Sequence, residues 1–422
     1  MLRKSTICRL AIVLAALSGC ASISKGVTEA IMEHKVEDER RCWITGRSFK
    51  GLEDLFTASE DDASESLARL KVMTVHGIGT HAPGYSRRLL DSLVSELGFT
   101  RMSEVVKTIS LTHPDYGNDL GILSVYRYMD EARHREVLFY ELTWDSIIEE
   151  QKQIIEFDNS QEAGAKRVPL NHTMKTFLNK SIPDALIYNT SYRMPIQISV
   201  AQTACWMLTE EWNNLPNGVS AYCDASQPSA WLRAGPSNIA IISHSLGSRI
   251  SLDAIQRTMM RVAGNPDLGE TSRKLRNKPV YLYMLSNQLP LLQVGQPLPE
   301  VHDRIADFCR PGGEFHDARL LEQLQIVAFS DPNDLFSYTV KPAFIDHYVD
   351  SRLCPTITNV VIEVAPVTTF LGTQAFANPQ SAHTDYDTDS RVLKMLVSGV
   401  GTDHGRDEVI DRCRFIEAIP ED

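Results

Sequence analysis

The feature that most constrains the fold is a strand-like run that passes directly into a helical pattern at residues 237–255. Four apolar residues, IAII at 239–242, are followed by Ser-His-Ser-Leu-Gly at 243–247 and then by an amphipathic segment. A short apolar run is typical of a buried strand, and the apolar spacing that follows is typical of a helix. The sequence therefore predicts a tight strand-to-helix turn at Ser245.

The same alternation recurs on both sides of this turn. Further strand-like runs, rich in β-branched and aromatic residues, lie at 70–77, 135–144, 278–287, 324–331 and 358–366. Residues 86–99, after the first of them, carry leucines at helical spacing and a glycine near the end. Near-continuous apolar strands that alternate with helices are typical of a mainly parallel sheet covered on both faces. We predict an α/β fold.

The first residues have the pattern of an export signal. A basic start is followed by the apolar run LAIVLAAL at 10–17, which is too short to span a bilayer as a helix. Leu-Ser-Gly-Cys at 17–20 resembles the lipobox of bacterial lipoproteins. The resemblance implies that residues 1–19 are a removed signal peptide, that Cys20 is acylated and anchors the chain, and that Ala21 directs it to the outer membrane, facing the periplasm. The alternative is a plain secretory signal with an incidental cysteine.

Export would place the other cysteines in an oxidising compartment, where disulfides form. Those in the mature chain are Cys42, Cys205, Cys223, Cys309, Cys354 and Cys413. Their pairing does not follow from the sequence, although Cys205 with Cys223 would close a short loop and is the pair we predict. Since no Cys-x-x-Cys, H-E-x-x-H or clustered His/Asp pattern is present, we predict no metal and no cofactor.

The chain divides by composition into a tether and a folded domain. Residues 20–66 are polar, and we interpret them as a lipidated tether with a small docking segment. Residues 67–422 form the predicted α/β domain. Within it, 145–235 is longer than one crossover helix requires and carries two helical patterns. We predict a helical insert there, in the position of a lid.

The turn at Ser245 is close to the G-x-S-x-G nucleophile elbow, with Ser243 in place of the first glycine. Small residues are needed where strand and helix nearly touch, and Ser243 and Gly247 meet that need. His244 is expected to point away and pack. The alternative is that Ser245 is an ordinary serine that caps the helix.

A glycine-rich turn follows the earlier strand, as VHGIGTH at 75–81. His76, Gly77 and Gly79 form this loop, in which no large side chain would block the backbone N–H groups. The N–H groups of Ile78 and of Leu246, the residue after Ser245, would then face a developing oxyanion. The alternative is a generic strand-to-helix glycine turn.

An acid and a base are both available after later strands. Asp331 and Asp334 lie in a turn after the strand at 324–331, and the position of Asp334, beyond the turn, favours it as the acid. Both could instead simply stabilise the turn. His383 lies on a polar loop between the last strand and a helical pattern, and is the predicted base. Two further histidines are downstream, His347 before that strand and His404 after the helix.

In chain order, the HGIG loop, Ser245, Asp334 and His383 resemble the α/β-hydrolase superfamily over roughly residues 68–400, apart from 145–235. The resemblance implies a serine hydrolase that cleaves carboxylic esters through an acyl-enzyme. On a membrane-anchored chain, it implies an esterase or lipase whose substrate is an acyl ester or a lipid.

Other functions remain open. A thioesterase or an acyltransferase would use the same residues. A non-catalytic envelope lipoprotein could use the scaffold for binding, and Ser243 in place of glycine would suit that alternative. A nucleic-acid partner is not expected, because the net charge is −12 and no basic run offsets it.

Overall fold

The computed structural model describes residues 40–58, 67–99, 106–132, 134–158, 167–224, 238–370, 374–401 and 413–416. The chain divides into two compact units. The larger comprises Arg40–Gln151 and Asp184–Asp422, and Lys152–Pro183 belongs to the other. The predicted signal peptide and Cys20 lie outside the described residues.

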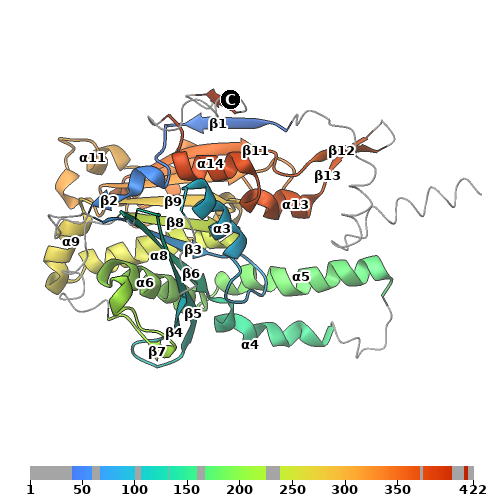
Figure 1. Cartoon of the computed structure of the whole chain (residues 1–422), viewed down its shortest axis with the longest axis horizontal. Helices are drawn as coiled ribbons and strands as arrows, with labels where there is room; N and C mark the ends of the chain where they lie inside the picture. Colours follow the sequence, from blue (N-terminus) through green and yellow to red (C-terminus); the bar gives the residue numbers. More distant parts are fainter. Residues whose placement is uncertain are drawn as a thin grey trace, which may run out of the picture. The chain divides into compact units, whose positions relative to one another are not determined.

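The larger unit is built on a 12-stranded sheet (Figure 1). Its strands, in spatial order, are β14 (Arg414–Ile416), β1 (Cys42–Gly46), β11 (Pro355–Ile362), β10 (Gln323–Ser330), β9 (Pro279–Leu285), β8 (Ile239–His244), β3 (Ala68–Val75), β6 (Arg135–Thr143), β5 (Asp119–Met129), β4 (Val106–Thr112) and β7 (Val219–Ala221). The twelfth, β2 (Thr57–Ala58), pairs with β3. The six strands from β6 through to β11 are parallel to one another. Strand β5 is antiparallel to β6 and β4, β2 is antiparallel to β3, and β1 is antiparallel to β11 but parallel to β14. The predicted α/β class with a mainly parallel sheet is confirmed.

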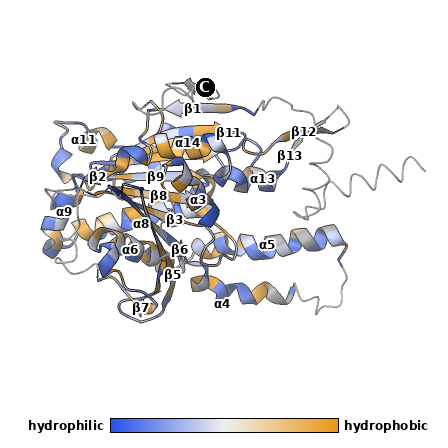
Figure 2. Ribbon diagram, in the orientation of Figure 1, coloured by the Kyte–Doolittle hydropathy of each residue, from blue (hydrophilic) through white to orange (hydrophobic). Residues whose placement is uncertain are grey.

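Helices cover both faces of the sheet because its central strands are apolar on both sides. Along β3, Met73 and Val75 belong to one buried cluster and Leu70 and Val72 to the other. The first cluster includes residues of α6 (Arg193–Thr209) and α8 (Leu246–Ala263). The second includes residues of α3 (Arg87–Glu96) and α14 (Ser390–Ser398). Figure 2 shows hydrophobic residues concentrated on these strands and helices.

Shorter elements connect this framework. The remaining helices are α4 (Glu149–Lys152), α5 (Pro169–Tyr188), α9 (Gly269–Leu275), α10 (Leu289–Gln293), α11 (Ile305–Cys309), α12 (Pro342–Tyr348) and α13 (Pro379–Thr384). Strands β12 (Val367–Phe370) and β13 (Gln374–Ala377) form a separate hairpin. Across the described ranges, no helix has the length and apolar content needed to cross a membrane.

The segment predicted to be a tether is partly a component of the sheet, which corrects the boundary at residue 67. Strands β1 and β2 both come from it, and Phe49, Leu52 and Leu55 are buried in the core. The predicted boundary at residue 67 therefore moves toward the N-terminus, so that the domain includes β1 and β2. Short strands that pair at a sheet edge carry too few residues to show the alternating pattern on which the prediction relied.

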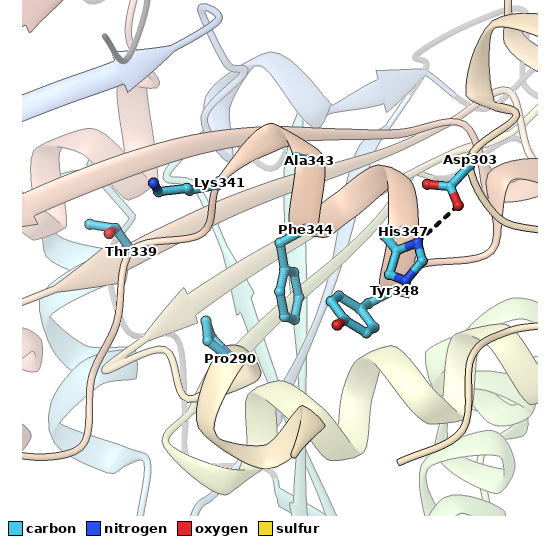
Figure 3. A pocket seen from close by; sticks show the side chains of 8 residues that line it. All are labelled: Pro290, Asp303, Thr339, Lys341, Ala343, Phe344, His347 and Tyr348. Atoms are coloured by element: carbon cyan, nitrogen blue, oxygen red, sulfur yellow. Dashed lines mark hydrogen bonds and ion pairs between the residues drawn. The ribbon is translucent and has the colours of Figure 1, made fainter. Parts of the chain in front are cut away.

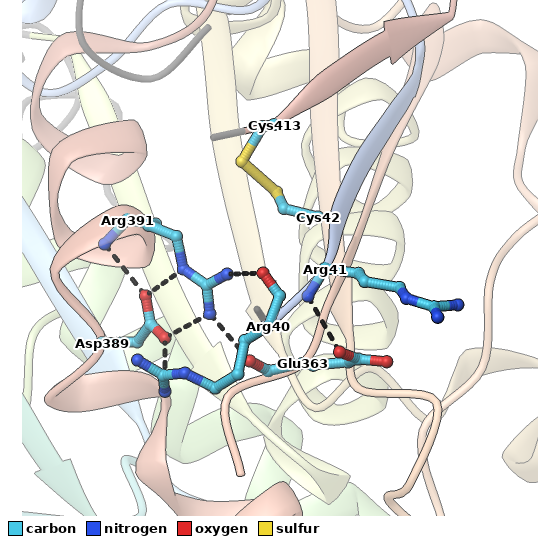
Figure 4. The surroundings of a disulfide bond; sticks show 7 residues. All are labelled: Arg40, Arg41, Cys42, Glu363, Asp389, Arg391 and Cys413. Atoms are coloured by element: carbon cyan, nitrogen blue, oxygen red, sulfur yellow. Dashed lines mark hydrogen bonds and ion pairs between the residues drawn. A yellow bond between two sulfur atoms is a disulfide. The ribbon is translucent and has the colours of Figure 1, made fainter. Parts of the chain in front are cut away.

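A disulfide and a charged network hold this N-terminal strand in place (Figure 4). Cys42 of β1 is bonded to Cys413, which precedes β14. Arg391 donates to Asp389 at 2.7 Å and to the Arg40 carbonyl at 3.0 Å. Both ends of the described chain are thus fixed to the same edge of the sheet.

The predicted insert is also corrected in part, because residues 188–223 belong to the main core. Tyr188, Val200 and Trp206 lie in the buried cluster with α8 and the central strands. Strand β7 pairs with β4, which places it in the sheet. The predicted Cys205–Cys223 disulfide is present, and Cys309 is bonded to Cys354. Of the described residues in this predicted insert, those within Lys152–Pro183 belong to the other unit.

Candidate active site

The candidate residues lie where parallel neighbouring strands end. Ser245 follows β8, Ser286 follows β9 and Asp334 comes shortly after β10. The HGIG loop follows β3, the other neighbour of β8. Because the carboxyl ends of parallel strands meet at one edge of a sheet, these residues share a single region, as the chain order predicted.

Ser245 is held in a strained backbone conformation at the turn between β8 and α8. Its φ is 56° and its ψ is −124°, values that non-glycine residues rarely adopt. Its N–H donates to the Leu285 carbonyl of β9 at 2.9 Å, which fixes the turn. Its side chain makes no capping hydrogen bond to α8, so the interpretation of Ser245 as an ordinary helix cap is wrong.

This strain has a measurable consequence for stability. Glycine adopts positive φ without penalty, whereas alanine keeps the steric cost that serine has. We therefore expect the Ser245→Gly variant to be more stable than the Ser245→Ala variant, with a free energy of unfolding about 1 kcal/mol higher. Chemical denaturation of the two variants measures the difference, and an alanine variant at least as stable as the glycine variant would show that the turn is unstrained.

Close approach at the turn explains its small residues. A Cβ on Gly247 would lie 2.4 Å from the Val75 carbonyl oxygen of β3, so only glycine fits there. Ser243, the departure from the elbow motif, is fully buried and its hydroxyl donates to the Tyr283 carbonyl at 3.3 Å. The additional side-chain oxygen therefore has an acceptor, and serine is accommodated at this position.

The HGIG loop lies directly against Ser245. A Cβ on Gly77 would lie 2.5 Å from the Ser245 Cβ and 3.0 Å from its Oγ. Ile78 is the next residue of this loop, and Leu246 is the first residue of α8, where N–H groups have no acceptor within the helix. The loop and the helix start thus flank the Ser245 hydroxyl.

His76 holds the HGIG loop in place through ring stacking and hydrogen bonds. Its ring stacks on Trp144, with centroids 4.8 Å apart, and its Nε2 accepts the Trp144 backbone N–H at 3.1 Å. Its Nδ1 is therefore the protonated nitrogen and donates to the Gly77 carbonyl at 2.9 Å. The Gly79 N–H donates to the buried carboxylate of Asp184 at 2.6 Å. Sequence analysis missed Trp144 and Asp184, which belong to distant segments with no motif.

Asp334 and His383 are in direct contact. His383 Nδ1 donates to the Asp334 carboxylate, 3.0 Å from each oxygen. Burial would raise the pKa of Asp334, but the hydrogen bonds from His383 and Ser286 outweigh it and hold the pKa below the ordinary value. His383 is in α13, a short helix, rather than on the predicted loop. Its Nε2, on the far side of the ring from Asp334, is left to act on a substrate or a nucleophile.

A third side chain joins this pair. The Ser286 hydroxyl donates to Asp334 Oδ2 at 2.6 Å and lies 2.9 Å from His383 Nδ1. Ser286 is fully buried and has a positive φ of 51°. Sequence analysis missed it, although its place at the end of a central parallel strand was a usable signal.

His244 also contacts His383, rather than only packing as predicted. Its Nε2–H donates to the His383 carbonyl at 2.7 Å, and the two rings are edge-to-face with centroids 5.1 Å apart. Burial lowers the pKa of His244 to about 3. His244 is therefore neutral at physiological pH and orients the backbone that carries His383.

The other candidates for acid and base lie elsewhere. Asp331 Oδ2 accepts the backbone N–H groups of Val364 and Ala365, at 2.7 and 3.1 Å, so its role is to hold the chain after β11. His347 contacts Asp303, 2.8 Å away. His404 lies outside the described residues.

The surrounding residues exclude Ser245 from solvent. Ser245 is fully buried, and its Oγ has no hydrogen-bond partner among the described residues. The structure therefore places Asp334 on His383 but does not join His383 to Ser245 by a hydrogen bond. Catalytic hydrogen bonds often form only in the presence of substrate.

Comparison with protein-family models, curated proteins and solved structures found no match for this chain.

Proposed function

We propose that this chain is a serine hydrolase of the α/β-hydrolase type that cleaves carboxylic esters. The observation that carries the proposal is the strained Ser245 at the end of β8, together with the His383–Asp334 pair at the same edge of the sheet. A serine hydroxyl is a weak nucleophile at neutral pH and needs an oriented base, and an aspartate-bound imidazole is such a base.

The proposed reaction has two halves. His383 Nε2 removes the Ser245 proton as Oγ bonds to the acyl carbon, and the imidazolium returns the proton to the departing alcohol. Asp334 holds the Nδ1–H tautomer and stabilises the imidazolium. The N–H groups of Ile78 and Leu246 stabilise the oxyanion. Water, deprotonated by His383, then releases the acid and regenerates Ser245.

A panel of p-nitrophenyl esters of increasing chain length tests this activity, with Ser245→Ala as the matched control. Saturable hydrolysis by the native chain and none above background in the variant is the expected result. Equal rates in both proteins would refute the proposal. Since Ser245 is buried, the panel includes a detergent series, in which an interface can favour an open state.

Ser286 is expected to act as a positioning residue for the His383–Asp334 pair. Ser286→Ala removes a hydrogen bond to an ionised carboxylate, a loss of about 1.5–3 kcal/mol. We expect a fall in kcat of roughly tenfold to a hundredfold with little change in KM, and an altered pH at half-maximal kcat/KM. Ser286→Cys, which keeps a donor of similar size without β-branching, should retain part of the rate. A purely structural role would instead leave the pH profile unchanged in both variants.

The proposed setting is the outer membrane, through a lipid on Cys20. Acyl chains anchor a protein durably when several act together. Cys20→Ser is expected to move the protein from the membrane fraction to the soluble fraction of fractionated cells, detected by immunoblot. Unchanged membrane retention would contradict the lipobox interpretation while leaving the hydrolase proposal intact.

Burial of Ser245 also favours one alternative, in which the protein binds a partner and its Ser245 site is not catalytic. The ester panel separates the two, because a binding protein shows no turnover in any detergent condition. An acyltransferase is separated by adding an alcohol acceptor, which would then receive the acyl group in preference to water.

A further inference from the structure

A second cluster of polar side chains lies apart from the serine and its partners. It consists of His302 and Asp303, on the loop before α11, and His347 near the end of α12. His302 and His347 each direct Nδ1 at the same carboxylate oxygen, Asp303 Oδ2, at 2.7 and 2.8 Å. All three candidate ligand atoms lie within 4.8 Å of one another.

The backbone holds this cluster in place. Asp303 has a positive φ of 57°, a strained conformation for a side chain larger than glycine. Its N–H donates to the Asp346 carbonyl at 2.8 Å, which ties the loop to α12 immediately before His347. On either side, Ser351 N–H donates to the Val301 carbonyl at 2.9 Å and Arg304 N–H donates to the Ser351 hydroxyl at 3.1 Å. The three side chains are thus set by fixed backbone rather than by a free loop.

We propose that His302, Asp303 and His347 form a binding site for a divalent transition-metal ion of the Zn²⁺ class. Two imidazole nitrogens and one carboxylate oxygen suit Zn²⁺, Co²⁺, Ni²⁺ or Cu²⁺, whereas Mg²⁺ and Ca²⁺ prefer all-oxygen sets. In a tetrahedral site with bonds of about 2.1 Å, neighbouring ligand atoms lie roughly 3.4 Å apart. The two Nδ1–Oδ2 separations are 2.7 and 2.8 Å and all three atoms lie within 4.8 Å of one another, so an ion would enter as each nitrogen moves outward from Asp303 Oδ2.

Metal binding would change the tautomer of both histidines. Each Nδ1–H now donates to Asp303, and each proton would move to Nε2 as Nδ1 gives its lone pair to the ion. His302, Asp303 and His347 are between 34% and 50% exposed, so an ion can reach them from solvent.

An open cavity of about 540 Å³ adjoins the cluster (Figure 3). Asp303 and His347 line it, together with Lys341, Phe344 and Tyr348. Three protein ligands leave a fourth position for water or another donor, as in sites that exchange ligands. The cavity gives such a donor access to that position.

Cobalt and zinc titrations of the metal-free chain, with no histidine tag, test this site. We expect one Co²⁺ per chain with the visible absorption of a tetrahedral ion, displacement by Zn²⁺, and no response to Mg²⁺ or Ca²⁺. His302→Ala and His347→Ala should each weaken Zn²⁺ affinity on the order of a hundredfold by isothermal calorimetry. His134→Ala, which removes an exposed histidine elsewhere, should bind as the native chain does.

The result that would overturn the site does not depend on the variants folding. Absence of saturable Zn²⁺ binding by the native chain, with its disulfides intact, would show that the cluster is only a hydrogen-bonded one. Binding that is unchanged in both folded alanine variants would place the ion elsewhere. Ser245→Ala should bind Zn²⁺ normally, so the test is independent of the proposed hydrolase activity.

Discussion

Replacing His383 with alanine is expected to lower kcat for ester hydrolysis on the order of 10⁴-fold to 10⁶-fold. His383 is the imidazole whose Nδ1 donates to the buried carboxylate of Asp334 at the Ser245 edge of the sheet. Without it, the Ser245 proton has no acceptor, and only the backbone donors and substrate binding remain to assist the reaction. Steady-state ester hydrolysis measures the effect, and thermal unfolding shows whether the variant is folded.

The matched control is His134→Ala, because His134 is exposed and donates its backbone N–H to Asp130 far along the chain from the site. Its activity should equal that of the native chain. If His383→Ala remains active while folded, His383 is not the base, and His347 and His404 become the candidates to test.

Asp334→Asn is expected to reduce kcat by about 10⁴-fold with the fold intact. An asparagine amide can present its NH₂ group to His383 Nδ1, which favours the wrong tautomer, with the proton on Nε2. It also removes the negative charge that stabilises the imidazolium. That charge is present at neutral pH, since hydrogen bonds from His383 and Ser286 outweigh burial and lower the pKa of Asp334.

Asp331→Asn provides the comparison, because the same change is made three residues earlier in the same turn. Asp331 accepts backbone N–H groups from Val364 and Ala365 and has no contact with His383 among the described hydrogen bonds. We expect a loss of about 1–3 kcal/mol in the free energy of unfolding and a nearly unchanged kcat. The reverse pattern, with activity lost in Asp331→Asn and kept in Asp334→Asn, would identify Asp331 as the acid.

The candidate site could be predicted from the sequence because parallel strands end at a shared edge of the sheet. Because the runs before Ser245 and Asp334 were both predicted to be strands of one mainly parallel sheet, their positions at the strand ends placed both residues at the same edge. The contact of His383 with Asp334 could not be derived this way, because no sequence pattern sets where the connection after the last parallel strand brings α13.

Other features have no local signal at all. Asp184 and Trp144 act through contacts between segments that are distant in the sequence. Asp303 and His347 are 44 residues apart in the sequence. They come together only because the loop that carries Asp303 packs on α12. The prediction that no metal would be bound rested on motifs of closely spaced ligands, which cannot detect such a cluster.

Fluorophosphonate labelling is the most direct measurement of the central claim, that Ser245 is an activated nucleophile. The probe bonds covalently to a serine only where the base and oxyanion donors are in place. We expect the native chain to be labelled at Ser245, faster in detergent because Ser245 is buried, and Ser245→Ala to be unlabelled. A folded native chain that stays unlabelled both with and without detergent would contradict the claim.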